Sequence, residues 1–92
     1  MSRPVLFEDL PVLYVKPGCT SCDDVSAFLD EHGIGYRQVN IVERPAGRTE
    51  MERKSGQFAA PVLDWHGRIL TSFNKDELIP FLHSRNVKLE DS

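Results

Sequence analysis

The sequence contains only two cysteines among its 92 residues, and both stand in one four-residue segment, Cys19-Thr20-Ser21-Cys22. A small domain held together by several disulfides needs more cysteines, so that class is excluded. No stretch approaches the roughly 20 consecutive apolar residues of a membrane-spanning helix. The formal net charge of −3 offers no general attraction to nucleic acid or to an anionic membrane, because both need a basic surface. The chain also has no internal repeats and no low-complexity segment.

What remains is a chain of ordinary composition, with 40% hydrophobic and 27% charged residues, long enough for one core. Residues 1–11 contain one early arginine and only a short apolar run, so they lack the apolar core of a signal peptide. We therefore expect a cytoplasmic location. The expected organisation is a lead-in over 1–11, one domain over 12–85 and a flexible tail over 86–92.

The cysteine pair stands where a strand is expected to meet a helix. The run Val12-Leu13-Tyr14-Val15 has strand composition, and Lys16-Pro17-Gly18 interrupts it. Behind the second cysteine, apolar residues recur at helical spacing (Val25, Phe28 and Leu29). Free backbone N–H groups and the helix dipole at such a junction favour a thiolate. A step of three residues along a helix also brings the two sulfurs within reach of a disulfide.

The remaining patterns predict an alternation of strands and helices. The first strand, helix and second strand form a βαβ unit, whose crossover predicts parallel strands with the helix packed across them. The next helix is charged except for Met51, so it is expected to be mostly exposed. A hairpin should follow, with its turn at Asp64-Trp65-His66-Gly67. The predicted elements are strand 12–16, helix 20–32, strand 36–42, helix 46–55, a third strand after 59–63 and a fourth over 68–71.

The last predicted helix opens at Asn74, with Glu77 three residues on in a capping-box spacing. Pro80 interrupts this pattern. A proline inside a helix removes one backbone hydrogen bond and costs about 3 kcal/mol. We therefore expect this helix to begin late, with a distorted first turn before residue 80.

This order, β-α-β-α-β-β-α with C-x-x-C at the first strand-to-helix junction, resembles the thioredoxin fold and specifically its glutaredoxin branch, over residues 12–84. The segment Lys16-Pro17-Gly18-Cys19-Thr20-Ser21-Cys22 looks like the opening of glutaredoxins. Gly56-Gln57-Phe58-Ala59-Ala60-Pro61 is similar to the family's Gly-Gln-x-x-x-Pro segment, which makes Pro61 the match for its cis-proline. From Pro61 to Asp76 the chain is similar to NrdH-type redoxins, the small electron donors to ribonucleotide reductase. The resemblance implies a four-stranded mixed sheet flanked by three helices.

We expect Cys19 to be the nucleophile, because it lies at the helix start and at the exposed end of the motif. Its thiolate would attack a substrate disulfide, and Cys22 would resolve the mixed disulfide. A pair of buried or metal-binding cysteines is the alternative. A zinc site needs further ligands, and the histidines at 32, 66 and 83 show no paired ligand spacing.

The resemblance also implies residues around the pair that contact the substrate or glutathione. Lys16 would stabilise the thiolate and hold a glutathione carboxylate, or it is simply a solvated lysine. Pro61 in a cis peptide would leave the backbone of Ala60 free to pair with an extended substrate. Asp76 would open the last helix near the site, or it only interacts with the helix dipole. The full set of expected substrate contacts is Lys16, Thr20, Ser21, Gln57, Ala60, Pro61 and Asp76.

Some residues depart from the glutaredoxin pattern. Thr71-Ser72 stands where glutaredoxins have two glycines, and Thr20-Ser21 stands where the family often has a tyrosine between the cysteines. Both changes weaken the case for glutathione as the substrate. Asp23 and Asp24 follow Cys22 where the family is often basic, and their charge opposes the thiolate. The reductant is therefore left open between glutathione and a thioredoxin-reductase-like flavoprotein.

The expected protein is a monomeric thiol–disulfide oxidoreductase with no tightly bound metal or cofactor and no nucleic-acid or membrane partner. Its expected substrates are protein disulfides, among them that of ribonucleotide reductase, or glutathione mixed disulfides. Two other classes stay open. The run 17–22 also looks like the opening of the arsenate reductase/Spx group, whose Spx members are redox-switched transcription regulators. A glutaredoxin that holds an iron–sulfur cluster through Cys19 and glutathione is the third possibility.

Overall fold

The computed structural model describes residues 10–57, 59–71 and 73–85. Within these residues the chain forms a four-stranded sheet and three helices, in the order predicted from the sequence. The mixed sheet and the element order β-α-β-α-β-β-α are confirmed. The expectations for the first nine residues, for Phe58 and Ser72, and for the tail 86–92 lie outside the described residues. The elements are β1 (Val12–Val15), α1 (Thr20–Glu31), β2 (Arg37–Asn40), α2 (Pro45–Ser55), β3 (Val62–Trp65), β4 (Arg68–Thr71) and α3 (Lys75–Ser84).

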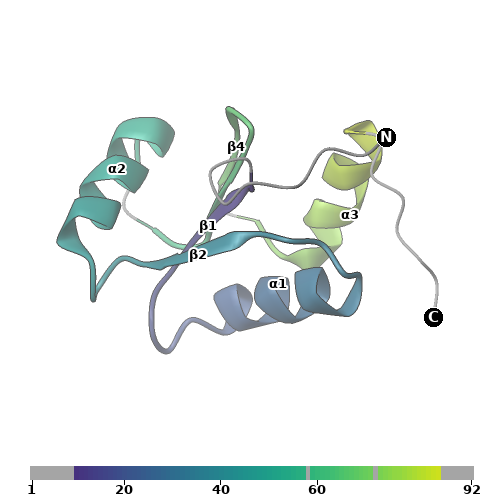
Figure 1. Ribbon diagram of the computed structural model, residues 1–92, viewed down its shortest axis with the longest axis horizontal. Helices are drawn as coiled ribbons and strands as arrows, with labels where there is room; N and C mark the ends of the chain where they lie inside the picture. The colour runs from purple at the N-terminus through teal and green to yellow at the C-terminus, as the bar shows by residue number, and fades with distance from the viewer. Residues whose placement is uncertain (1–9, 58, 72, 86–92) are drawn as a thin grey trace.

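The strands lie in the order β2-β1-β3-β4. β1 and β2 are parallel, as the βαβ pattern predicts, and β1–β3 and β3–β4 are antiparallel. In Figure 1, α1 and α3 lie on one side of the sheet and α2 lies on the other. The molecule therefore has three layers, with the sheet in the middle.

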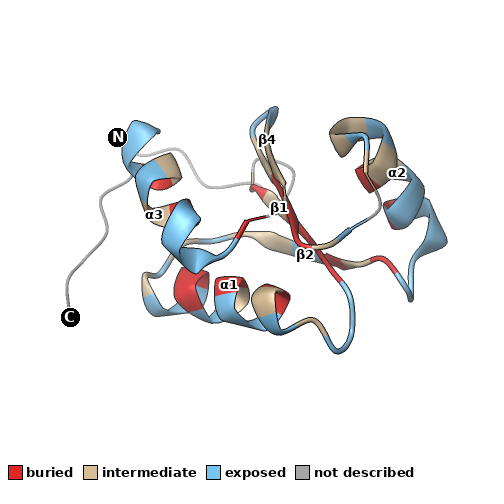
Figure 2. Ribbon diagram, turned by 180° about the vertical axis from the view of Figure 1, so that it is seen from behind, coloured by how far each residue is buried: buried red, intermediate tan, exposed pale blue. Residues whose placement is uncertain are grey.

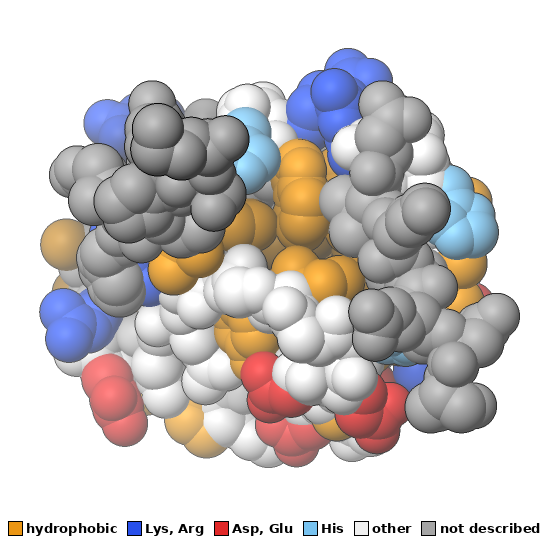
Figure 3. All heavy atoms as spheres, turned by 45° about the vertical axis from the view of Figure 1, so that its right-hand side comes forward, with side chains coloured by type: hydrophobic (Ala, Val, Ile, Leu, Met, Phe, Trp, Pro, Cys, Tyr) orange, Lys and Arg blue, Asp and Glu red, His pale blue; other side chains and the backbone are white. Residues whose placement is uncertain are grey.

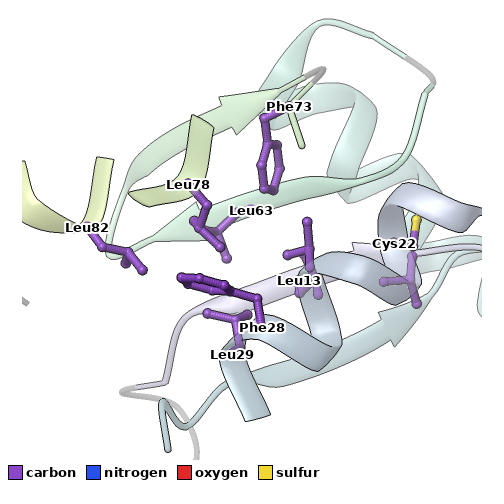
Figure 4. Close-up of a cluster of buried hydrophobic side chains, with 10 residues drawn as sticks. Leu13, Cys22, Phe28, Leu29, Leu63, Phe73, Leu78 and Leu82 are labelled. Atoms are coloured by element: carbon purple, nitrogen blue, oxygen red, sulfur yellow. The ribbon is translucent and has the colours of Figure 1, made fainter. Parts of the chain in front are cut away.

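The larger part of the core lies between the sheet and the pair α1 and α3. In Figure 4 side chains from β1 (Leu13), α1 (Phe28), β3 (Leu63) and α3 (Leu78) point toward one another, and Cys22 lies at one end of this group. A smaller cluster fills the other face under α2, and Met51 is the α2 residue that enters it. Figure 2 shows the resulting pattern: red marks segments of the strands and parts of α1, whereas α2 is mostly pale blue and tan. The predicted exposure of α2 is thus confirmed.

The β3–β4 hairpin turns later than the sequence predicts. Asp64 and Trp65 belong to β3, and Trp65 pairs with Arg68, so only His66 and Gly67 form the loop. Both loop residues have positive φ, +50° and +95° respectively. This is the backbone that a tight two-residue hairpin loop requires. The predicted four-residue turn is therefore wrong at its first two positions.

The expectation of a late start for α3 is also wrong. The helix begins at Lys75, and the Asn74 side chain caps it by accepting a hydrogen bond from Glu77 N at 3.1 Å. Pro80 stands inside the helix and is exposed. On the opposite face, Leu78 and Leu82 are fully buried. Burying two leucines stabilises by about 3–6 kcal/mol, which is enough to offset the loss at the proline.

None of the helices within the described ranges is long and apolar enough to cross a membrane.

Candidate active site at the Cys19–Cys22 pair

The topology brings several loops to one end of the sheet. Val15, the last residue of β1, pairs with Asn40, the last residue of β2. Val62, at the start of β3, pairs with Tyr14 and with Thr71 at the end of β4. The last residues of β1, β2 and β4 and the first residue of β3 therefore lie at the same end of the sheet. The segments that follow β1, β2 and β4 and the segment that precedes β3 all meet there. The cysteine motif, the start of α2, the proline segment and the approach to α3 are neighbours for this reason.

Cys19 is the N-cap residue of α1. Its backbone is extended, with φ −95° and ψ 105°, and its Sγ accepts a hydrogen bond from Cys22 N at 3.1 Å. The sulfur thus takes the place of the side-chain oxygen that usually caps a helix. A donor N–H and the positive end of the helix dipole both stabilise a negative charge there. The predicted position of Cys19 at a helix N-terminus is confirmed.

The two cysteines form a disulfide in this structure, and their Cα atoms are 5.2 Å apart. This separation lies within the usual range for a disulfide. Cys22 is buried, with 1% of its surface exposed, and packs in the core. Cys19 is only half-buried. An incoming group can therefore reach Cys19 more easily than Cys22.

The Ala60–Pro61 peptide bond is cis, as the resemblance to glutaredoxins implies. The Sγ of Cys19 lies 4.0 Å from the carbonyl oxygen of Ala60. Residues separated by 41 positions in the chain are thus in contact at the site. The structure brings together Cys19, Cys22 and Ala60, which the sequence predicts as members of one site.

The other predicted residues lie on segments that meet at the same end of the sheet. Lys16 is exposed just after β1, and Thr20 is exposed at the first position of α1. Ser21 is half-buried next to Cys22. Asp76 is exposed in the first turn of α3. These positions agree with substrate contacts, and the roles of the four residues stay predictions.

Gln57 lies in the segment that joins α2 to Pro61 and is half-buried. The hydroxyl of Ser55 accepts a hydrogen bond from Gln57 N at 3.3 Å and donates its own proton back to Met51 O within α2, at 2.6 Å. This pair of bonds fixes the direction in which the chain leaves α2 toward the proline. Its contact with glutathione stays a prediction.

The two sides of the site differ in charge. α1 contains four acidic residues and no basic one, and Asp23 and Asp24 are exposed directly after Cys22. Figure 3, which brings the α3 side of the molecule forward, also shows acidic side chains along the lower edge, on the side where α1 runs. On the other side of the cysteine loop lie the exposed Lys16 and the start of α2, whose first turn contains no acidic residue. A charged substrate would therefore be oriented as it approaches.

Within the part of the chain that the structure describes, no group of three or more His, Cys, Asp or Glu side chains is placed to hold a metal ion. Thr71, at the end of β4, is half-buried near the site. Ser72, the second residue that replaces the family's glycine pair, lies outside the described residues.

One polar cluster, between α2 and the sheet, was not predicted from the sequence. The ammonium of Lys54 donates to Tyr14 Oη at 2.8 Å and to Asp64 Oδ2 at 2.7 Å, and it pairs with Glu50 Oε1 at 2.9 Å. Burial works to lower the pKa of Lys54, but the hydrogen bonds that it donates to these partners outweigh burial and raise the pKa above its usual value of 10.5. The spacing of Glu50 and Lys54, four residues apart on a helix, was the available sequence signal.

The fold of the chain is shared with solved structures of thioredoxin-like proteins. The thioredoxin-like protein BC3987 superposes with a TM-score of 0.73 and 21% identity, over 78% of this chain and 97% of that one. A glutaredoxin from Archaeoglobus fulgidus superposes with a TM-score of 0.70 and 19% identity, over 89% of this chain and 98% of that one. These likenesses define the class: a thioredoxin-fold protein with a C-x-x-C pair at the start of its first helix.

Sequence comparison identifies the family within that class. The glutaredoxin family model matches residues 12–70, so the chain belongs to the glutaredoxin family. A glutaredoxin-like 8.6 kDa protein of the rubredoxin operon of Clostridium pasteurianum is 32% identical over 66 residues, covering 72% of this chain and 88% of that protein. The family and the cysteine pair together support a thiol oxidoreductase in general terms.

A second group of relatives is transcriptional. The global regulator Spx of Listeria innocua is 42% identical over 40 residues, which are 44% of this chain. This match spans 30% of the regulator's length. It therefore concerns only a part of either protein.

Proposed function

We propose that this protein is a dithiol electron carrier of the glutaredoxin/NrdH type, which reduces protein disulfides or glutathione mixed disulfides. The observation that carries the proposal is the asymmetry of the pair. Cys19 Sγ accepts the N–H of Cys22 at the helix start and is half-exposed, whereas Cys22 is 1% exposed. One sulfur is thus suited to attack and the other to resolve.

In the proposed cycle the Cys19 thiolate attacks one sulfur of the substrate disulfide. A bond forms between this sulfur and Cys19 Sγ, and the other substrate sulfur leaves as a thiolate and takes up a proton. Cys22 then loses its proton and attacks Cys19 Sγ, which releases the second substrate thiol. The substrate gains two electrons, and the carrier is left as the Cys19–Cys22 disulfide. Two thiols of glutathione, or a thioredoxin-reductase-like flavoprotein, return the electrons.

In this proposal the substrate binds across the cis Ala60–Pro61 peptide. The backbone of Ala60, 4.0 Å from Cys19 Sγ, would pair with an extended substrate segment in an antiparallel manner. Thr20, Ser21 and Asp76 would contact the substrate from the starts of α1 and α3. Lys16 and Gln57 would bind the carboxylates of glutathione where glutathione is the co-substrate. The cycle needs no bound metal or cofactor, and a reducing compartment such as the cytoplasm suits it.

The natural substrate is proposed as a protein disulfide, with that of ribonucleotide reductase as one candidate. The segment from Pro61 to Asp76 is similar to NrdH-type redoxins, and this similarity supports the choice. The threonine and serine at 71 and 72 also support it, because side chains there would narrow the space that two glycines leave for glutathione. One comparison identifies the reductant. NADPH-coupled turnover is measured with glutathione and glutathione reductase and, separately, with a thioredoxin reductase.

The roles of the two cysteines are tested by trapping. Cys22→Ser should accumulate a mixed disulfide with a disulfide substrate, because the resolving thiol is missing. Cys19→Ser should form none, because Cys22 is buried. Mass spectrometry of the intact protein reads both results. The proposal is overturned by equal trapping in the two variants, or by wild type that turns over with neither reducing system.

The match to Spx favours a second candidate, a redox-switched regulator that binds RNA polymerase. This candidate is weaker, because the match leaves most of the regulator's length without a counterpart. A pull-down with RNA polymerase, using reduced and oxidised protein, distinguishes the two functions. Redox-dependent binding would support the regulator.

A further inference from the structure

An open hollow lies beside the cysteine loop, between the end of β2 and the start of α2. It has a volume of about 380 Å³. Its lining combines two cationic side chains with apolar surface, and of these residues the proposed cycle uses only Lys16, as a contact for glutathione. We call it the Lys16–Arg48 hollow; its lining residues are Lys16, Ile41, Val42, Pro45 and Arg48.

The parallel pairing of β1 and β2 places this hollow next to Cys19. Ile41 N donates to Val15 O at 2.9 Å, which continues the ladder one residue beyond β2. Lys16 follows Val15 directly, so it stands beside Ile41 and Val42. Cys19 comes three residues after Lys16, at the start of α1. A substrate segment with its disulfide at Cys19 therefore needs only a few residues to reach the hollow.

The apolar part of the hollow is exposed to solvent at Val42. Val42 is 65% exposed, and it is the one large hydrophobic residue that is exposed among the described residues. Its position is fixed, because the Asn40 side chain accepts hydrogen bonds from Val42 N at 2.9 Å and Glu43 N at 3.1 Å. Such a bond from an asparagine to the backbone two residues on stabilises a turn. The exposed valine is thus preformed for a contact.

The polar part of the hollow is cationic. Arg48 bonds Glu52 Oε1 through its Nε at 3.1 Å, and its side chain is 58% exposed. A guanidinium has five N–H donors, so this bond uses one of them. The first turn of α2 contains no acidic residue, although the exposed Glu43 lies next to Val42. The hollow itself is lined by two cations and no acid, whereas α1, on the opposite side of Cys19, carries four acids and no basic residue.

We propose that the Lys16–Arg48 hollow binds the substrate protein beside its reactive disulfide, through a short segment with a carboxylate and an apolar side chain. The carboxylate would lie between Lys16 and Arg48, and the apolar side chain would cover Val42. This inference rests on the proposed function, because it names which protein disulfides the carrier prefers. Glutathione offers carboxylates but no apolar side chain. A substitution of Val42 should therefore affect the binding of the protein substrate and not that of glutathione.

The test uses two fluorogenic disulfide peptides that differ only beside the cysteine. One carries Glu-Leu at that place, and the other carries Gln-Ser. Wild type should reduce the Glu-Leu peptide with a kcat/KM about fivefold higher, and salt should weaken this preference because the charges are exposed. Arg48→Gln and Val42→Ser should each reduce the preference by about two- to threefold. Arg53→Gln is the matched control, since Arg53 is an exposed arginine of α2 outside the hollow.

The outcomes separate this inference from the function on which it rests. Equal kcat/KM for the two peptides, or the same change in Arg48→Gln and Arg53→Gln, would overturn the hollow as a substrate site while the carrier function stands. Reduction of neither peptide by wild type would overturn the carrier function itself. A loss of glutathione disulfide reduction in Val42→Ser, with the peptide preference unchanged, would assign the hollow to glutathione and also overturn the inference.

Discussion

Cys19 experiences two opposing electrostatic influences. The N–H of Cys22, 3.1 Å from Cys19 Sγ, and the dipole of α1 favour a thiolate at this sulfur. The carboxylates of Asp23, in the first turn of α1, and of Asp24, the next residue, disfavour it. Both aspartates are exposed, so solvent screens their effect. The acidity of Cys19 therefore depends on a balance that single substitutions can shift.

In the reduced protein, Asp23→Asn and Asp24→Asn should each lower the pKa of Cys19 by a few tenths of a unit, as expected for exposed charges near a helix end. Ultraviolet absorbance of the thiolate during a pH titration measures this value. Asp30→Asn, at the other end of the same helix, is the control and should leave the titration of Cys19 in place. An unchanged titration in both test variants would show that these carboxylates do not act on the thiolate.

At the level of the elements, α2 packs closely on β2 through a glycine. A Cβ atom at Gly47 would lie 2.5 Å from Val39 Cγ1, closer than two carbon atoms can approach. Gly47 stands inside α2, where alanine would otherwise favour the helix by about 1 kcal/mol. The close approach of helix and strand thus explains why a poor helix former is found there.

Gly47→Ala should lower the free energy of unfolding by about 1–2 kcal/mol, because the cost of overpacking exceeds the gain in helix propensity. In a Val39→Ala background the same substitution should raise it by about 1 kcal/mol, since the clashing methyl is gone. Urea unfolding followed by circular dichroism measures the four proteins of this cycle. The same sign of the Gly47→Ala effect in both backgrounds would contradict the proposed contact.

At the level of the whole molecule, Lys54 links α2 to two strands of the sheet. It bonds Tyr14 on β1 and Asp64 on β3. Burial works to raise the pKa of Asp64, but hydrogen bonds from Lys54 and from Gly67 N lower it below 3.8. The hydrogen bond from Lys54 likewise lowers the pKa of Glu50 below 4.5. The folded state therefore holds fewer protons than the unfolded chain in mild acid.

This difference sets the direction of the pH dependence. The two carboxylates contribute stability above their unfolded pKa values, and this contribution is lost as the pH falls through their lower folded values. The raised pKa of Lys54 contributes fully below pH 10.5 and is lost only at higher pH. Acid should therefore weaken the fold below about pH 4.5, whereas Lys54 itself does not titrate in that range.

Lys54→Met should lower the free energy of unfolding by about 1–3 kcal/mol at pH 7, because it leaves Asp64 partly buried without its cation. It should also flatten the decline between pH 5 and pH 3, a range set by the ordinary carboxylate pKa values of about 4. Thermal unfolding across this range, with Arg53→Met as the control, measures both effects. A decline as steep as that of wild type would mean that other carboxylates govern the acid response.

The sequence by itself determined the elements of this protein and supported a thiol oxidoreductase in general terms. The cysteine pair at a strand-to-helix junction, the Asn74 cap and the glycine-proline segment before β3 are local signals, and the described structure contains each of them. Such signals are reliable because a cap or a turn depends on residues within about one turn of chain. The family resemblance extended them to the cis Ala60–Pro61 peptide.

Only the tertiary structure decided the features that depend on distant residues. Pro80 stands within α3 because Leu78 and Leu82 are buried against other elements, and Asp64 belongs to β3 because of its pairing in the sheet. Tyr14 and Lys54, which are hydrogen-bonded across 40 positions, and the hollow beside Cys19 could not be read from local patterns. Packing and hydrogen bonds between layers outweigh local preference wherever burial contributes more free energy than propensity does.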